Sequence, residues 1–351
     1  MRLIKLDEVT GEEILARAIL TEGYKELLSE GSKLKKDYIP KLLDMGITEV
    51  YVQDNKVSAQ DMVILKEEVT KKCREQVRSV ISKHIYEHDD DSMLAISKTA
   101  DSIISNIMEE DEVVEQIYDI KERSADIYEH SINTCSLSML VSLKMKLSNE
   151  IVHDIGVGCL LHDIGLRYIT VDYENKGLEE MNDKEIAEYK KHPIYGYSAV
   201  KTENWLSKTS KEIILCHHEY IDGSGYPLHA RDISTGVKIA AVCDFFDESI
   251  CGIGHVRLKV HEVVEYLKGY KGILFDTQIV DELLDFTAVY PSKSTVITNE
   301  DELAIVIKQN KGFPERPVLQ LVADKNGKKY TEPKVIDLLE HNNVFIKKVI
   351  D

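Results

Sequence analysis

The stretch "VHDIGVGCLLHDIGLRYI", residues 152–169, contains the tetrapeptide His-Asp-Ile-Gly twice, at 153–156 and again at 162–165. A histidine followed by an aspartate offers an imidazole nitrogen and a carboxylate, and both are ligands for transition metals. On one continuous helix the two histidines face opposite sides, so only one copy can reach a given site. The second copy follows the apolar run "VGCLL" into a core. We therefore predict that His162 and Asp163 belong to the site.

The bulk composition bounds the class of protein. The chain has 351 residues, 43% hydrophobic and 30% charged, which is typical of a globular protein with room for two or three domains. A net charge of −18 argues against DNA, RNA polymers or an acidic membrane as partners. No run of about 18 uncharged apolar residues occurs, so we predict no membrane span. The six cysteines form no C-x-x-C pair, which indicates reduced, buried thiols and a cytoplasmic protein.

The hydrophobic pattern changes several times along the chain. Residues 1–57 mix short apolar runs with a helix-like segment, which predicts a small α/β regulatory module. Helical periodicity over 58–128 predicts a connector and the start of a bundle, and 129–290 predicts its core. Residues 291–351 predict a β-rich extension, with strands in "STVIT", "LAIVI" and "PVLQLVA" and a turn at 324–327. The predicted fold is mainly α. The N-terminal module leaves two partners open, a second copy of the chain or a signalling protein.

Further ligand-type side chains recur near helix ends or beside loops. The full set of candidate ligands is Asp126, His130, His162, Asp163, His192, His217, His218 and Asp244. Such a nitrogen and oxygen set suits iron, zinc or manganese, and a carboxylate can bridge two ions. Two ions about 3.5–4 Å apart can hold a hydroxide and polarise a phosphate. Asp247, one turn after Asp244, is either part of this site or a carboxylate on the helix surface.

The two adjacent histidines lead into the loop "EYIDGSGYP" at 219–227, whose two glycines and proline predict a tight, pre-shaped turn. Two interpretations remain open, a purely architectural loop or one that lines a substrate cleft. Under the second, the contacts would come from Asp222, Gly223, Gly225, Tyr226 and Pro227.

His130, His162-Asp163, His192, "HHEYIDGSGYP" and Asp244 together resemble the HD-GYP subgroup of the HD phosphohydrolase superfamily. The resemblance covers about residues 100–290, and "ERPVLQLVADKNGK" resembles an extension that often follows such domains. It implies a helical bundle, a cluster of two or three iron or manganese ions, and hydrolysis of cyclic di-GMP through a metal-bound hydroxide. Asp163 would be the bridging, catalytic ligand.

Departures from the family pattern concern the substrate rather than the metals. Members usually continue HDIG with lysine, whereas this chain has Leu166 followed by Arg167. An Arg-rich "RPYR" stretch is replaced by "CGIGHVRLK", and "SKST" after Pro291 lacks a glycine that is common there. Arg167 is then either a substitute phosphate anchor or a solvated helix charge. Three functions stay open: a cyclic di-GMP phosphodiesterase, a phosphohydrolase for another cyclic dinucleotide or nucleotide, and a catalytically weak nucleotide-binding receptor.

Overall fold

The structure is a computed structural model of the 351-residue chain. It describes residues 2–6, 9, 11, 13–15, 19–20, 26–29, 31–45, 47, 49–52, 64–65, 67–84, 90–108, 117–120, 126–173, 177–254 and 256–350. The chain divides into two compact units, Met1–Gln60 and Asp61–Asp351, and each is described by itself.

The N-terminal unit combines two small antiparallel pairs of strands with one short helix. Its elements are β1 (Arg2–Lys5) paired with β4 (Glu49–Val52), β2 (Ile19–Leu20) paired with β3 (Glu26–Leu28), the 3-10 helix η2 (Lys36–Tyr38) and α1 (Ile39–Asp44). Pro40 lies in the first turn of α1, where the helix needs no backbone N–H from it. The unit has its own core, which includes Leu6, Leu15 and Leu34. It shows the predicted mixture of helix and strand.

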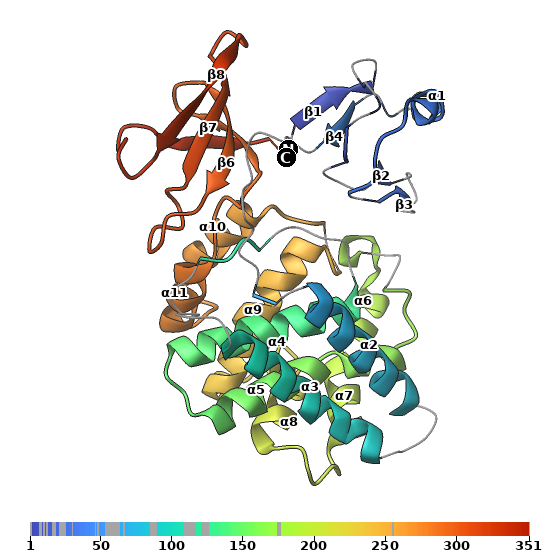
Figure 1. Ribbon diagram of the computed structural model, residues 1–351. Coiled ribbons are helices and arrows are strands. Elements are labelled where there is room, and N and C mark those ends of the chain that lie inside the picture. The colour runs from blue at the N-terminus through green and yellow to red at the C-terminus, as the bar shows by residue number, and fades with distance from the viewer. Residues whose placement is uncertain are drawn as a thin grey trace. The chain divides into compact units, whose positions relative to one another are not determined.

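The second unit begins with a large helical body (Figure 1). Its helices are α2 (Glu67–His84), α3 (Asp90–Met108), α4 (Ile127–Lys144), α5 (Asn149–Leu161), α6 (Asp183–Tyr189), α7 (His192–Val200), α8 (Lys208–Cys216), α9 (Thr235–Cys251), α10 (Val260–Tyr270) and α11 (Thr277–Phe286), with the 3-10 helices η4 (Ile164–Tyr168) and η5 (Leu178–Glu180). Ser148, Ser207 and Ser234 begin α5, α8 and α9, because each hydroxyl accepts a first-turn backbone N–H that has no partner within the helix. The predicted helical bundle is confirmed.

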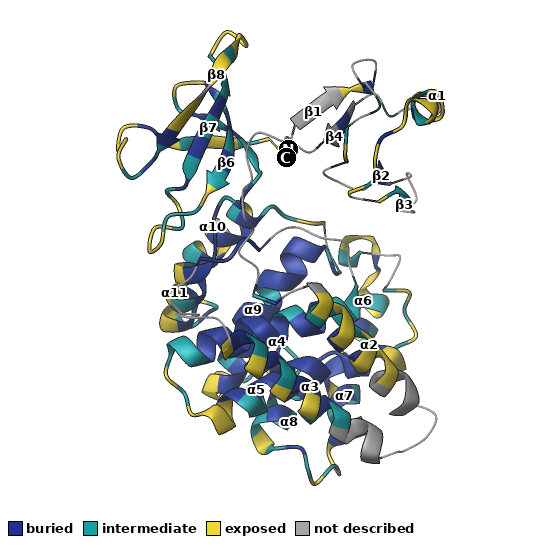
Figure 2. Ribbon diagram, in the orientation of Figure 1, coloured by how far each residue is buried: buried dark blue, intermediate teal, exposed yellow. Residues whose placement is uncertain are grey.

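Helices α4 and α9 form the centre of this body. α4 packs against α5 and α9, and α5 packs against α8. Figure 2 shows α9 buried along most of its length, whereas α2 presents exposed residues on one face. A helix that is buried nearly all round carries apolar side chains as a rule, so polar groups on it need a specific partner. α9 nevertheless buries Asp244, Asp247 and Glu248.

The C-terminal segment forms a five-stranded antiparallel sheet in the order β8-β7-β6-β5-β9. Its strands are β5 (Thr295–Thr298), β6 (Leu303–Lys308), β7 (Val318–Ala323), β8 (Lys329–Asp337) and β9 (Ile346–Val349). The hairpin between β7 and β8 turns where Gly327 adopts a positive φ of 77°, a region that favours glycine. The predicted β-rich extension is confirmed, and β8 and β9 add strands that the sequence did not single out. Within the described residues, no helix is both long and apolar enough to cross a membrane.

Candidate metal centre

Seven of the eight predicted ligands gather in the interior of the helical body. They come from different elements: His130 from α4, His162 from the end of α5, Asp163 from the start of η4, His192 from the start of α7, His217 and His218 from the end of α8, and Asp244 from α9. Each of them is at most 9% exposed. Helix ends therefore hold most members of the cluster, and the middle of α9 holds Asp244.

The first group of ligand atoms consists of His130, His162 and Asp244. Asp244 Oδ1 lies 3.0 Å from His130 Nε2 and 3.1 Å from His162 Nε2. The two Nε2 atoms lie 3.2 Å from each other. Two imidazole nitrogens and a carboxylate oxygen that converge in this way are a ligand set for one divalent ion.

The second group consists of Asp163, His192, His217 and His218. Asp163 Oδ1 lies 3.3 Å from His192 Nε2 and 3.7 Å from His217 Nε2. The other oxygen of Asp163, Oδ2, lies 3.4 Å from His162 Nε2, on the side of the first group. The two oxygens of one carboxylate thus face two different sets of histidines, which is the geometry of a bridging ligand.

The hydrogen bonds of the histidine rings determine which nitrogen of each ring carries the proton and which one faces the centre. His162, His192 and His217 place Nδ1 at 2.6, 2.9 and 3.2 Å from backbone carbonyl oxygens. A carbonyl only accepts, so Nδ1 carries the proton and Nε2 of each neutral ring presents a lone pair to the centre. His130 Nδ1 lies 2.8 Å from Asp247 Oδ2 and follows the same logic. Four nitrogen lone pairs therefore face carboxylate oxygens, an arrangement that a cation stabilises.

Protons on the histidines can supply part of the positive charge that these carboxylates attract. Burial alone lowers the pKa of His130, but the carboxylates of Asp244 and Asp247 raise it to about 10. Burial is also the main cause that lowers the pKa of His217, to about 3, and neighbouring His162 adds to it. Burial alone would raise the pKa of Asp163, but the histidines around it hold that pKa well below its usual range. The histidines thus keep Asp163 ionised, whereas burial and the charge of Asp244 raise the pKa of Glu248 well above its ordinary value.

Two close backbone approaches bring the ligands together. A side chain on Gly165 would lie 1.8 Å from the carbonyl oxygen of His192, so the glycine of the second HDIG lets η4 reach α7. A side chain on Gly225 would lie 2.4 Å from the carbonyl oxygen of His218. The loop therefore folds back on the histidine pair, and Tyr226 stacks on His218 with ring centroids 4.6 Å apart.

Other loop residues shape the turn itself. Asp222 Oδ1 accepts the backbone N–H of Ser224 at 2.8 Å, and Gly223 has a positive φ of 79°. Pro227 follows a cis peptide bond. These contacts are architectural, and a substrate contact by the loop stays a prediction.

Asp126 is placed differently from the prediction. Its carboxylate forms an ion pair with Arg74 of α2 and accepts the backbone N–H of Glu129, so it caps the start of α4. It belongs to none of the three groups of ligand atoms found among the described residues. Asp126 and His130 are four residues apart and could share one helix face, but Asp126 is the N-cap residue of α4, so its side chain turns to the backbone N–H of Glu129.

The first HDIG copy also lies away from the cluster. His153 Nε2 lies 3.1 Å from Ser97 Oγ and 3.5 Å from Asp101 Oδ1, both on α3. The structure thus separates the two copies as the helical spacing predicts.

Two buried carboxylates near the cluster were absent from the predicted ligand set. Glu248 forms a third group with His218 and Asp244, and its spacing of one turn from Asp244 was a signal in the sequence. Glu219, fully buried, accepts the backbone N–H of Ala230 at 3.0 Å and so closes the loop. Asp247, left open by the sequence, orients His130 and accepts a hydrogen bond from Cys251.

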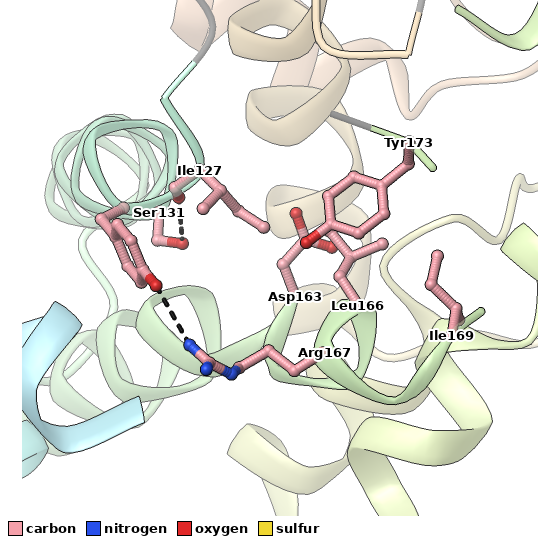
Figure 3. A pocket seen from close by; sticks show the side chains of 8 residues that line it. Ile127, Ser131, Asp163, Leu166, Arg167, Ile169 and Tyr173 are labelled. Carbon is pink, nitrogen blue, oxygen red and sulfur yellow. Dashed lines mark hydrogen bonds between the residues drawn. The ribbon is translucent and has the colours of Figure 1, made fainter. Parts of the chain in front are cut away.

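A cavity of about 350 Å³ lies beside the second HDIG. Its lining consists of Ile127, Tyr128, Ser131, Asp163, Leu166, Arg167, Ile169 and Tyr173. Figure 3 shows the carboxylate of Asp163 and the ring of Tyr173 turned toward one another, with Arg167 on another wall. Arg167 donates a hydrogen bond to the hydroxyl of Tyr128 at 3.1 Å. The guanidinium of Arg167 and the carboxylate of Asp163 therefore open onto one space.

The helical body and the C-terminal sheet each match a known protein family. Residues 112–279 match the family described as "HD domain", and residues 295–351 match "KOW domain associated with HD domain". The chain is 24% identical over 245 residues to "Cyclic di-GMP phosphodiesterase PA4108" of Pseudomonas aeruginosa, a match that covers 69% of this chain and 59% of the relative. Residues 112–279 therefore belong to the HD domain family, and this agrees with the predicted resemblance to its HD-GYP subgroup.

A second relative and a solved structure also resemble this chain. "Cyclic di-GMP phosphodiesterase PdeB" of Borreliella burgdorferi is 25% identical over 228 residues, 63% of this chain and 59% of the relative. Both curated relatives are thus matched over about three-fifths of their own length. The structure of Bd1817, an HDG"Y"P protein from Bdellovibrio bacteriovorus, has a TM-score of 0.53 and 18% sequence identity, and covers 80% of this chain and 97% of that one. The last likeness supports the fold.

Proposed function

We propose that this chain is a metal-dependent phosphodiesterase that hydrolyses cyclic di-GMP. The observation that carries the proposal is Asp163, whose two oxygens face two separate sets of histidine nitrogens. The proposed ligands are His130, His162, Asp163, His192, His217, His218 and Asp244. The names of the curated relatives support cyclic di-GMP as the substrate.

Iron or manganese is the proposed metal, because imidazole and carboxylate ligands in this proportion suit both. Bound ions would supply Lewis-acid polarisation of the phosphodiester and activation of water. The chain itself contributes ring orientation through the Nδ1 hydrogen bonds, and Asp163 fixes the spacing of the two groups. The helices fix these ligand positions, and such fixed geometry is what positioning a reacting phosphate requires.

Arg167 is the proposed phosphate anchor. It lines the cavity beside Asp163, and the hydroxyl of Tyr128 holds its guanidinium. Leu166 lines the same cavity and is 1% exposed, so the position that carries lysine in the family faces this space without a charge. We infer a substrate site with one strong cation rather than two. The six buried free cysteines support a cytoplasmic location.

The second candidate is a receptor that binds a cyclic nucleotide and turns it over poorly. The apolar Leu166 favours it, because hydrolysis needs the phosphate held in line with the attacking water, whereas binding alone does not. A phosphohydrolase for another cyclic dinucleotide shares the same centre and differs only in the cavity.

One experiment separates these candidates. Protein loaded with Mn²⁺ or Fe²⁺ is incubated with cyclic di-GMP, cyclic di-AMP and 3′,3′-cyclic GMP-AMP, while binding and product are measured in parallel. We expect slow, metal-dependent hydrolysis of cyclic di-GMP to pGpG or GMP. Tight binding without product in fully loaded protein would replace the enzyme by the receptor. Turnover of another dinucleotide alone would change the substrate.

A further inference from the structure

Glu248 is a buried carboxylate that lies beside the centre, next to Asp244 and His218. It follows Asp244 by one turn of α9, so the two side chains leave the helix on the same face. Glu248 is 6% exposed. Within the described parts of the chain, none of the ion pairs includes it. A buried, ionised carboxylate is strongly unfavourable unless a cation or several hydrogen bonds compensate it.

His218 supplies a nitrogen at the same place. A ring nitrogen of His218 and oxygens of Asp244 and Glu248 all lie within 4.8 Å of one another. Nδ1 of His218 is 3.7 Å from Asp244 Oδ2, and its Nε2 is buried without a hydrogen-bond partner in the described structure. A buried imidazole that lies with two carboxylates is a ligand set for a divalent ion, since either ring nitrogen can hold the lone pair.

The two carboxylate oxygens of Asp244 face different histidines. Oδ1 faces His130 and His162 at 3.0 and 3.1 Å, whereas Oδ2 faces His218. This repeats, on α9, the division that Asp163 makes between its own two histidine groups. A carboxylate with this geometry can ligate one ion with each oxygen, so a further ion on the His218 side needs no movement of Asp244.

We propose that Glu248 is a metal ligand and that it holds a third divalent cation together with His218 and Asp244. His218 gives its one lone pair to this cation, and Asp163, His192 and His217 hold the cation of the second group. The inference rests on the proposed function in one respect, because both require metal ions in the centre. It goes beyond that function because the third position depends on a glutamate outside the seven proposed ligands. Manganese or iron suits this set for the same reason as in the rest of the centre.

Metal content tests the proposal directly. The parent chain and Glu248→Gln are stripped with a chelator, loaded with Mn²⁺, desalted and analysed by mass spectrometry for metal per chain. We expect Glu248→Gln to hold one ion fewer than the parent. Glu302→Gln is the matched control, because Glu302 is also buried, at 8% exposure, but lies in the turn between β5 and β6. It should hold the same number of ions as the parent.

A second variant covers the case in which the amide disturbs folding. Glu248→Asp keeps the charge and shortens the side chain, so the third ion should still bind but be released at a lower chelator concentration than from the parent. Equal metal content in the parent and Glu248→Gln would overturn the third site while leaving the proposed function intact. Loss of every ion from Glu248→Gln, with the variant folded, would also overturn a separate third position. A parent chain that takes up no ions would refute both proposals.

Discussion

At the scale of single residues, two buried aspartates organise the centre. Asp163 and Asp244 each direct their two oxygens to different histidines, and the ring orientations are fixed by hydrogen bonds on the far side of each imidazole. Each aspartate contacts two groups of candidate ligands, so replacing one aspartate should disturb both groups. Such a substitution therefore tests the proposed metal centre as a whole.

Asp163→Asn should lower the bound metal by at least one ion per chain and reduce hydrolysis of cyclic di-GMP below detection. An amide carries no negative charge and cannot bridge two cations as a carboxylate does. Metal analysis and product chromatography on the loaded protein measure both effects. Asp154→Asn, the same change in the first HDIG copy, should leave both unchanged. The reverse pattern would mean that the first copy carries the metal.

Leu166→Lys should tighten binding of cyclic di-GMP, because the new ammonium would face the cavity that Arg167 and Asp163 line. A charge-assisted contact to phosphate is worth about 1–2 kcal/mol, or roughly a tenfold change in Kd. Calorimetric titration of the metal-loaded variant measures it. Leu228→Lys, at a leucine that is 56% exposed, is the control. Unchanged affinity in Leu166→Lys with the metal intact would show that phosphate is held elsewhere.

At the scale of elements, the loop that follows α8 is shaped by the histidine pair rather than by its own hydrogen bonds alone. The backbone N–H of Tyr226 donates to the carbonyl of His218 at 3.0 Å, and Gly225 lies against that same carbonyl. The buried carboxylate of Glu219 then holds the far end of the loop. This explains why two glycines and a proline follow the histidines directly.

Gly225→Ala should destabilise the protein and loosen metal binding, because the added methyl would lie 2.4 Å from backbone at His218. We expect a loss of about 1–3 kcal/mol in unfolding free energy, typical of overpacking. Thermal unfolding with and without Mn²⁺ measures both effects. Gly269→Ala is the control: a side chain there meets nothing within 4 Å, and it lies inside α10. It should be neutral or stabilising.

At the scale of the whole molecule, the second unit joins the helical body to the C-terminal sheet through a buried carboxylate. Asp119, 5% exposed, accepts hydrogen bonds from the Ser292 backbone N–H at 2.7 Å and from Gln309 Nε2 at 3.0 Å. The Tyr118 backbone N–H donates to Phe286 at 2.7 Å beside it. The segment before α4 is therefore fixed to the end of the helical body and to the sheet.

The contributions of His130 and His217 to the stability of metal-free protein should together be greatest near pH 6.5. The pKa of His130 is raised to about 10, so its stabilisation is complete below the unfolded value of 6.5 and is lost as the pH rises toward 10. The pKa of His217 is lowered to about 3, so the unfolded chain gains a proton first, and stability is lost as the pH falls from 6.5 toward 3.

Thermal unfolding of chelator-treated protein from pH 4 to pH 10 measures this dependence, with a slope of at most about 1.4 kcal/mol per pH unit for one buried group. Loading with Mn²⁺ should flatten the alkaline side, because an ion replaces the proton that His130 loses. If the free energy of unfolding of metal-free protein rose steadily from pH 6.5 to pH 10, the raised pKa of His130 would be contradicted.

The local sequence pattern was enough to predict the helices and strands and most of the candidate ligands that the structure brings together. The periodicities of helix and strand follow from backbone geometry, so the helical body, the mixed N-terminal unit and the β-rich tail could be predicted from residues near one another in the chain. The HDIG pair at 162–163 and the string "HHEYIDGSGYP" marked the ligands because metal chemistry demands those side chains. The nine-residue spacing between the two HDIG copies already separated their faces.

Only the tertiary structure decided which carboxylates enter the centre. Asp126 and Glu248 are both acidic residues one turn from a ligand, yet Asp126 pairs with Arg74 and Glu248 lies with His218. The choice depends on α2, α4, α8 and α9 packing together, which brings residues more than 25 positions apart in the chain into contact. Spacing along one helix gives the direction of a side chain, but the partner that it meets is set by how the helices pack.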